Sequence, residues 1–288
     1  MNDRPGQLRQ IAGVVVLYNP ALWVVANIRS YLDQVGELFV VDNSDRSTPE
    51  VVSQLALMPR LTYIANGSNL GVARALNIGA ERAVAAGYCR LLTMDQDSSA
   101  MPGMVSALLS CLDGEAGDAV GLAAPFLATW KDERPPESPA CQPVLTAMTS
   151  GSLLDLRVYQ KAGPFADELF IDFVDIEYCL RLQRTGFKVL RANRAILKHN
   201  VGSKIALPGG FAVTSHDAIR KYYKTRNRLC VWERYWTDFP AYCLRDAVRF
   251  FLELARLFLF EPERVGKTRM MARGINHACR GKMGKYVV

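Results

Sequence analysis

Four short apolar runs in the first hundred residues constrain the fold of this chain most strongly. They are GVVVLYN (Gly13–Asn19), LFVVDNS (Leu38–Ser44), LTYIAN (Leu61–Asn66) and RLLTMD (Arg90–Asp95). Runs of this length that stop at polar residues are typical of strands buried on both faces of a parallel sheet. Residues 21–34 and 68–87 have helical spacing, and Gly87 is a favourable helix C-cap. The order β, α, β, β, α, β predicts a doubly wound α/β sheet.

Polar residues follow each of the four predicted strands. They are Tyr18 and Asn19, then Asp42 with Asn43 and Ser44, then Asn66, and finally Asp95 with Gln96 and Asp97. Ligands of open α/β sheets bind beyond the carboxyl ends of the strands. We therefore expect these four sets to gather at one edge of the sheet and to form the binding site.

The pair Asp95 and Asp97 offers a way to bind phosphate through a metal ion. The chain has neither the GxGxxG of dinucleotide-binding folds nor the GxxxxGK[ST] of P-loop enzymes. Hard cations such as Mg²⁺ and Mn²⁺ prefer carboxylate oxygens and leave coordination positions open for substrate phosphates. The alternative is that both aspartates cap a following helix or turn, whose start is marked by Ser98, Ser99 and Pro102. Their place beside three other polar strand ends favours the metal site.

Cysteine usage and the absence of targeting signals indicate a cytoplasmic protein. The seven cysteines are scattered, odd in number and form no CxxC, so we expect reduced, mostly buried thiols and no zinc site. The N-terminus, MNDRPGQLRQ, carries no apolar segment of a signal peptide. No stretch reaches the roughly 20 apolar residues that a membrane span needs.

Charge is distributed unevenly along the chain. Residues 191–288 carry 20 Lys/Arg and 7 Asp/Glu, whereas residues 1–190 carry 15 and 21. A basic C-terminal part suggests an anionic partner. Nucleic acid is disfavoured because no nucleic-acid-binding motif accompanies the charge. The stretch 242–260 combines apolar and aromatic residues with arginines, and it either lies on an anionic membrane or packs on the protein's own core or in a homodimer.

Nine segments in a fixed order carry a family resemblance over roughly residues 11–285. They are VVVLYNP, VVDNSD, NGSNLGVARALNIGA, LLTMDQDS, TSGSLL, FIDFVDIEYCLRLQRTGF, ILKHNVGS, RKYYKTRNRL and RGINHACRGKMGK. With them the chain resembles inverting family-2 glycosyltransferases of the GT-A fold, and most closely the bacterial rhamnosyltransferases that use dTDP-L-rhamnose. The resemblance implies a Rossmann-like, mostly parallel sheet with flanking helices. It also implies a catalytic domain at 1–212 and a helical, basic region at 213–288.

The resemblance implies roles for individual residues. Asp42 would read the pyrimidine base, Asp95 would contact the ribose or the metal, and Asp97 would bind the metal directly. His199 would line the diphosphate or metal site. The other residues expected to contact the nucleotide sugar are Tyr18, Asn19, Asn43, Asn69, Gly71, Arg74 and Arg226.

A catalytic base is needed because a sugar hydroxyl is a poor nucleophile until its proton is removed. The segment DFVDIEYCLR supplies three carboxylates, and we predict Asp175 as the base over Asp172 or Glu177. The family commonly has Glu-Asp here, and Val174 replaces that glutamate. These acidic residues also suit the first turn of a helix, which is the alternative role. We expect Arg181 to pair with the carboxylates.

The resemblance implies that the chain transfers L-rhamnose from dTDP-L-rhamnose to a lipid-linked surface glycan, with Mg²⁺ or Mn²⁺ as cofactor. It would act in the cytoplasm, peripherally on the inner face of the cytoplasmic membrane. One alternative is a transferase for UDP-galactofuranose or a UDP-hexose such as UDP-glucose. Another is a non-catalytic protein that binds nucleotides or acts as a membrane-associated scaffold.

Overall fold

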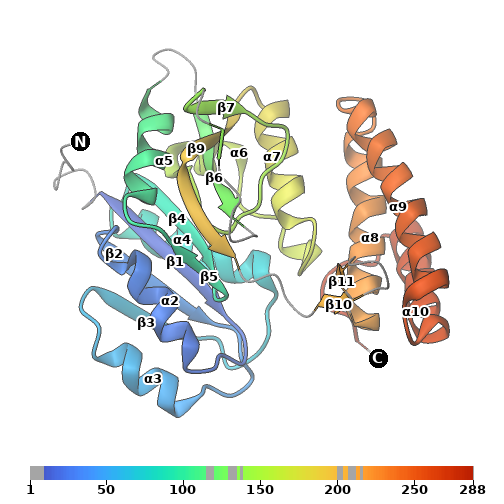
Figure 1. The fold of residues 1–288 in the computed structure, drawn as a ribbon, viewed down its shortest axis with the longest axis horizontal. Helices are drawn as coiled ribbons and strands as arrows, with labels where there is room; N and C mark the ends of the chain where they lie inside the picture. The colour runs from blue at the N-terminus through green and yellow to red at the C-terminus, as the bar shows by residue number, and fades with distance from the viewer. Residues whose placement is uncertain are drawn as a thin grey trace.

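The N-terminal third of the chain forms the parallel half of a large sheet (Figure 1). The structure, a computed structural model, describes residues 10–114, 120–128, 135–136, 139–199, 204–206, 212–214 and 217–287. Strands β1 (Ile11–Leu17), β2 (Glu37–Asp42), β3 (Leu61–Ala65) and β4 (Arg90–Asp95) lie in the order β3-β2-β1-β4, and all neighbours are parallel. All four predicted strands are thus confirmed.

Helices connect the parallel strands. They are α2 (Trp23–Leu32), α3 (Pro49–Ala56) and α4 (Val72–Ala85). The sequence prediction placed no helix between β2 and β3 and was wrong there. With eight residues, of which only Val51 and Leu55 are buried, α3 is too short for its periodicity to stand out.

The second half of the sheet is mixed rather than parallel. Strand β8 (Ser152–Asp155) pairs antiparallel with β4 and with β6 (Val120–Ala128), and β6 runs parallel to β9 (Lys188–His199). The short strands β5 (Ser98–Ala100) and β7 (Cys141–Pro143) are antiparallel to β9. Helices α5 (Met104–Asp113), α6 (Leu156–Ala162) and α7 (Val174–Arg184) and the 3-10 helix η1 (Asp167–Leu169) complete this half. The prediction of a sheet with flanking helices is confirmed, but beyond β4 the sheet combines antiparallel and parallel pairs.

Two apolar layers cover the sheet. One joins the inward side chains of β1 to α2 and α5, for example Val15, Ile28 and Leu108. The other joins the opposite side of β1 to α4, α6 and α7. Helix α4 approaches β1 so closely that a side chain at Gly79 would collide with Val14, so only glycine fits. Burial of aliphatic side chains on both faces explains why the strands read as continuous apolar runs.

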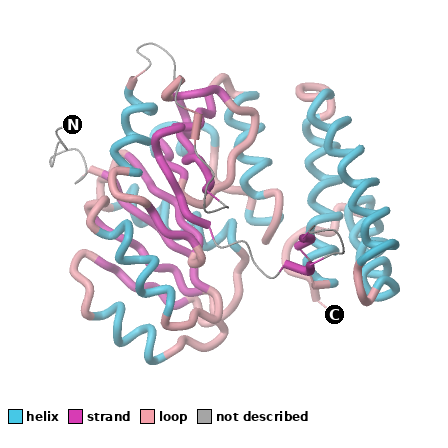
Figure 2. Tube along the Cα trace, in the orientation of Figure 1, coloured by secondary structure: helices cyan, strands magenta, loops and turns pink. Residues whose placement is uncertain are grey.

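Three helices form a separate group beside the sheet (Figures 1 and 2). They are α8 (Ala218–Tyr235), α9 (Pro240–Phe260) and α10 (Arg264–Cys279), and they follow the small hairpin of β10 (Lys204–Ala206) and β11 (Ala212–Thr214). The Asn227 amide of α8 donates to the carbonyl oxygens of Leu169, Ile171 and Asp172 at 2.8, 2.8 and 2.9 Å. This contact fixes α8 against the loop that precedes α7.

Two further observations bear on the sequence predictions. Cys111 and Cys141 form a disulfide with a Cα–Cα separation of 5.7 Å, so the expectation that all seven cysteines are reduced thiols is wrong for this pair. None of the helices in the described ranges has the length and apolar content needed to cross a bilayer.

Candidate active site

The polar ends of β1, β2, β3 and β4 lie at one edge of the sheet, as the sequence predicted. Parallel register places Leu17 beside Asp42, Val16 beside Asp95, and Asp42 beside Ala65. The residues that follow these strands therefore share one rim.

The Asp95–Asp97 turn is held rigidly from both sides. The side chain of Gln96 bonds both backbone groups of Tyr18, accepting from its N–H at 2.9 Å and donating to its carbonyl at 3.2 Å. Asn27 donates to the Gln96 carbonyl at 2.8 Å. On the other side, the Asp95 N–H donates to Ser150 Oγ at 3.1 Å. The turn leads into β5 rather than into a helix, so neither aspartate caps a helix directly after it.

Tyr18 and Asn19 present exposed side chains at this edge, 45% exposed for Tyr18. Asn19 has a positive φ of 46° and its N–H donates to Ser44 Oγ at 2.7 Å. A left-handed backbone of this kind is several-fold enriched in asparagine. Both residues are therefore placed where a ligand of the strand edge would meet them.

Asp42 and Asn43 lie beneath the edge instead of on it, with exposed fractions of 1% and 2%. The Asp42 carboxylate accepts from the Tyr63 hydroxyl at 2.5 Å and from the Ser44 N–H at 2.9 Å. Burial and this carboxylate raise the pKa of Tyr63 to about 12. The Asn43 amide donates to the Gly71 carbonyl at 2.9 Å. These contacts hold the edge together.

The NLG loop packs against the segment that carries the predicted base. Asn69 Oδ1 accepts from the Gly71 N–H at 2.9 Å, and the Val72 N–H donates to the Phe170 carbonyl at 2.7 Å. Gly71 has φ +88°, and a Cβ there would lie 2.7 Å from the Phe170 oxygen and 2.9 Å from its Cα. Only glycine satisfies both the backbone angle and the close approach.

The three acidic residues of DFVDIEYCLR occupy different environments. Glu177 is 2% exposed, pairs with Arg181 at 2.8 Å as predicted, and accepts from the Tyr235 hydroxyl at 2.8 Å. Asp172 pairs with Arg220 at 3.3 Å. Asp175 accepts the Ile176 N–H at 2.9 Å and lines a pocket. Of the three, Asp175 is the carboxylate that faces a cavity.

Positive φ angles bring this segment to its position. Phe170, Asp172 and Phe173 have φ values of 67°, 62° and 65°. Such angles cost of order 1–3 kcal/mol each in non-glycine residues and persist where surrounding contacts enforce them. The Asn227 amide and the NLG loop supply those contacts.

The carboxylates at the edge influence one another electrostatically. Burial, followed by repulsion from Asp97 and Asp175, raises the pKa of Asp95 to about 7, while Arg220 acts in the opposite direction. Burial raises the pKa of Asp175 to about 6, and the charge of Asp172 adds to this effect. Asp95, Asp97 and Asp175 come from β4, the following turn and α7, yet the charges of Asp97 and Asp175 both act on Asp95, and we refer to these three residues as the acidic cluster. Such a cluster favours a cation.

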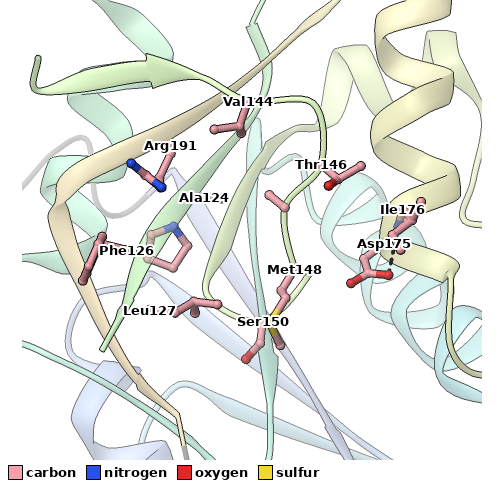
Figure 3. Close-up of a pocket in the computed structure, with 12 residues that line it drawn as sticks. Ala124, Phe126, Leu127, Val144, Thr146, Met148, Ser150, Asp175, Ile176 and Arg191 are labelled. Atoms are coloured by element: carbon pink, nitrogen blue, oxygen red, sulfur yellow. Dashed lines mark hydrogen bonds between the residues drawn. The ribbon is translucent and has the colours of Figure 1, made fainter. Parts of the chain in front are cut away.

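A pocket of about 430 Å³ adjoins this cluster (Figure 3). Asp175 and Ile176 of α7 lie on one side, and Phe126 of β6 and Arg191 of β9 lie on the other. Ser150, which positions Asp95, forms part of the floor. The volume is within the usual range for small-molecule sites, roughly 300–1,000 Å³. The Asp175 carboxylate is thus accessible to a molecule bound in this pocket.

The metal-binding prediction is supported only in part. Within the described ranges, no three His, Cys, Asp or Glu side chains are arranged as a complete metal site. The backbone of His199 pairs in register with Ser98, the residue after Asp97, but the position of its side chain lies outside the described structure. Mg²⁺ is commonly held by one or two carboxylates together with substrate phosphates. Asp95 and Asp97 match such a pair of carboxylates. A bound cation would stabilise the ionised form of Asp95, whose pKa is raised in the protein alone.

Two predicted nucleotide contacts lie in other surroundings. Arg226 is fully buried, and its guanidinium donates to the carbonyl oxygens of Gly284 and Leu169 at 2.7 and 3.1 Å. It is therefore a structural residue that ties α8 to the C-terminus, and we correct its assignment. Arg74 is partly exposed on α4 and pairs with Glu81 at 2.7 Å.

Two residues to which the sequence analysis gave no role, Ser150 and Arg220, contribute to the site. Ser150 fixes the acidic turn together with Gln96, and Arg220 brings a positive charge from α8. Gln96 was expected at the edge as part of the polar set that follows β4. Ser150 and Arg220 reach the site through distant pairing, which no local pattern reveals.

Comparisons with known proteins agree with this arrangement. The family model "Glycosyl transferase family 2" matches residues 14–162, just over half of the chain. The chain is 28% identical over 235 residues to the dTDP-rhamnosyl transferase RfbF of Shigella flexneri, covering 75% of this chain and 78% of that protein.

Solved structures show the same fold at low sequence identity. S. aureus TarS 1–349 in complex with UDP-GlcNAc has a TM-score of 0.63 and 11% identity, covering 93% of this chain and 81% of that one. The structure of GalNAc-T7 with UDP, GalNAc and Mn²⁺ has a TM-score of 0.61 and 12% identity. The match covers 81% of this chain and 49% of GalNAc-T7. The chain therefore belongs to glycosyltransferase family 2 and has the GT-A fold.

Proposed function

We propose that this protein transfers L-rhamnose from dTDP-L-rhamnose to a hydroxyl of a surface glycan, with inversion at the anomeric carbon. The observation that carries the proposal is the acidic cluster of Asp95, Asp97 and Asp175 beside the pocket. The choice of donor is supported by the similarity to RfbF, whose name describes a dTDP-rhamnosyl transferase.

The donor would bind over the strand edge. Its nucleoside part would meet the exposed side chains of Tyr18 and Asn19 and the NLG loop with Asn69 and Gly71. Its diphosphate would lie at Asp95 and Asp97. A position beyond the carboxyl ends of parallel strands is where ligands bind in open α/β sheets.

Asp95 and Asp97 would hold Mg²⁺ or Mn²⁺ together with the diphosphate, and His199 remains a candidate third ligand. The bound ion would offset the negative charge that develops on the leaving nucleoside diphosphate. The GalNAc-T7 structure, which contains UDP and Mn²⁺, supports a cation in this fold. Gln96 and Ser150 would keep the two carboxylates in place before the ligand arrives.

Asp175 would act as the general base. The acceptor oxygen forms a bond to the anomeric carbon while the bond to the diphosphate breaks, and the hydroxyl proton passes to the Asp175 carboxylate. A pKa of about 6 leaves this group mostly ionised at neutral pH and still basic enough to accept a proton. A single displacement inverts the anomeric centre, so a β-L-rhamnosyl donor gives an α-linkage.

The pocket of Figure 3 would receive the acceptor sugar. Phe126 offers an apolar face to a sugar ring, and Arg191, held by Gln142 at 2.9 Å, offers hydrogen-bond donors. We further propose that residues 1–212 form the catalytic domain and that residues 213–288 form a region for acceptor, membrane or dimer contacts. A lipid-linked acceptor on the inner face of the cytoplasmic membrane is consistent with this division.

The donor test is a release assay. Purified protein with Mn²⁺ is incubated with dTDP-L-rhamnose, UDP-glucose or UDP-galactofuranose, and free nucleoside diphosphate is measured with and without glycan acceptors. We expect faster release from dTDP-L-rhamnose, and loss of that release in Asp97→Asn. Faster release from a UDP-sugar would establish the alternative donor. No release from any donor would favour a non-catalytic nucleotide-binding protein.

A further inference from the structure

The outer side of α9 is an exposed apolar face. Five large apolar side chains on it are 54–68% exposed: Leu244, Val248, Phe251, Leu252 and Leu259. Their spacing of 4, 7, 8 and 15 residues from Leu244 places them on one side of the helix. The buried residues Tyr242, Cys243, Phe250 and Leu257 occupy the opposite side and anchor the helix.

A row of arginines borders this apolar face. Arg245, Arg249 and Arg256 are all exposed and lie on one flank of α9, again at helical spacing. The two acidic residues of the helix point inward, where Asp246 pairs with Arg228 at 3.0 Å and Glu253 with the same guanidinium at 3.1 Å. The exposed side of α9 is therefore apolar and positively charged, with no acidic residue of its own.

The start of α9 is fixed close to the active site. Tyr242 and Cys243 pack in one apolar cluster with Phe173 and Leu180, which belong to the segment around Asp175. The negative charge of Asp175 also contributes to the raised pKa of Tyr242, although burial is the main cause. A surface that binds α9 would thus lie at a fixed orientation to the proposed catalytic base.

We propose that this face of α9 binds the surface of an anionic lipid bilayer, with the apolar side chains in the interface and the arginines on lipid phosphates. Amphipathic helices with a basic polar side bind membranes in this way without crossing them. Each arginine near an anionic surface strengthens binding by about fivefold, the equivalent of about 1 kcal/mol. The inference deepens the proposed function and rests on its assignment of residues 213–288 to acceptor, membrane or dimer contacts, but its test requires neither a donor nor a glycan.

Charge complementarity favours lipid over a second copy of the chain. A two-fold dimer brings the same patch of both copies together. Two rows of Arg245, Arg249 and Arg256 would then approach each other, and α9 offers no exposed carboxylate to neutralise them. An anionic bilayer neutralises the row and covers the apolar side at the same time.

The test is flotation of the full chain with vesicles of phosphatidylcholine, with or without phosphatidylglycerol. We expect binding that requires phosphatidylglycerol and weakens with added salt. Replacing Arg245, Arg249 and Arg256 together by Gln should lower the partition coefficient about 100-fold. Phe251→Ser with Leu252→Ser should also abolish flotation.

Matched controls remove the same charge or the same apolar area elsewhere. Arg29, Arg82 and Lys161 are exposed on α2, α4 and α6, and their triple replacement by Gln should leave flotation unchanged. Leu57→Ser, at a side chain 77% exposed beside α3, is the apolar control. Unchanged melting temperatures and unchanged dTDP binding in solution separate a loss of membrane binding from a loss of fold or of donor binding.

Three outcomes overturn the proposal. The first is equal binding, or no binding, of the wild type to both vesicle types. The second is equal loss of flotation in the control and α9 variants. The third is a dimer in analytical ultracentrifugation that Phe251→Ser with Leu252→Ser dissociates, because the face is then an interface between copies.

Discussion

Replacement of Asp175 by Asn tests the division of labour between the acidic residues. The asparagine Oδ1 still accepts the Ile176 N–H, a bond of 2.9 Å in the wild type, so α7 keeps its first turn. Only the basicity of the group is removed. General-base catalysis typically contributes about 10²–10⁴-fold to a rate, so we expect kcat to fall by that factor with little change in donor affinity.

The same substitution should not destabilise the protein. The pKa of Asp175 is raised from 3.8 to about 6, so the folded state favours the protonated form. The contribution of this group to stability is therefore greatest below pH 4 and is lost as the pH rises through 6. A pKa shift of two units corresponds to about 3 kcal/mol of stability. Because Asp175 is partly exposed to solvent, we expect Asp175→Asn to raise the free energy of unfolding at neutral pH by only roughly 1 kcal/mol.

The assay measures transfer rate and melting temperature together at pH 7.5. The control is Glu177→Gln, which breaks the buried pair with Arg181 and should lower stability strongly. Asp172→Asn tests the neighbouring carboxylate and should retain more activity than Asp175→Asn. Transfer by Asp175→Asn within tenfold of the wild type would refute the base assignment, and so would an equal loss in Asp172→Asn.

Three other perturbations follow from the structure. The affinity of the metal-free protein for Mn²⁺ should rise between pH 5 and pH 7.5 by up to about tenfold per pH unit, because Asp95, with a pKa of about 7, must lose its proton before it binds the cation. Calorimetric titration at several pH values measures this affinity, and an affinity that does not change with pH would contradict the prediction. Without metal, the free energy of unfolding should fall over the same pH range, and added Mn²⁺ should restore it in thermal melts. Gly71→Ala should cost at least about 1–3 kcal/mol in urea denaturation, because its φ is +88° and the new Cβ would meet the backbone of Phe170; wild-type stability would show that the loop adapts freely. Arg226→Met should lower the free energy of unfolding by about 1–3 kcal/mol, because the Gly284 carbonyl would lose the hydrogen bond from the Arg226 guanidinium. Normal stability with impaired nucleotide binding would instead return Arg226 to the donor site.

The parallel half of the fold was predictable because its signal is local. Buried strands such as Ile11–Leu17 and Arg90–Asp95 are continuous apolar runs, and their polar ends follow directly in the sequence. Parallel pairing then fixes Asp42 and Asp95 at a common edge. The expectation that this edge forms the binding site needs no further information than the strand order.

The rest of the site depends on contacts between distant parts of the chain. Ser150 reaches Asp95 only because β8 inserts antiparallel between β4 and β6, a pairing that apolar runs do not encode. Arg226 was assigned to the donor because a basic residue can help to offset the negative charge of the leaving diphosphate. In the structure, Arg226 is turned towards the backbone carbonyl groups of Leu169 and Gly284 and donates to both, and helical periodicity alone cannot distinguish such a buried position from a ligand-facing one.

The most direct test of the central claim is calorimetric titration of dTDP and UDP into the wild type and Asp97→Asn, with and without Mn²⁺. The account predicts that dTDP binds more tightly than UDP, that binding requires Mn²⁺, and that Asp97→Asn loses the metal-dependent part while keeping its melting temperature. Binding of dTDP that is equally tight without Mn²⁺ and in Asp97→Asn would contradict the assignment of the Asp95–Asp97 turn as the site of the metal and the nucleotide.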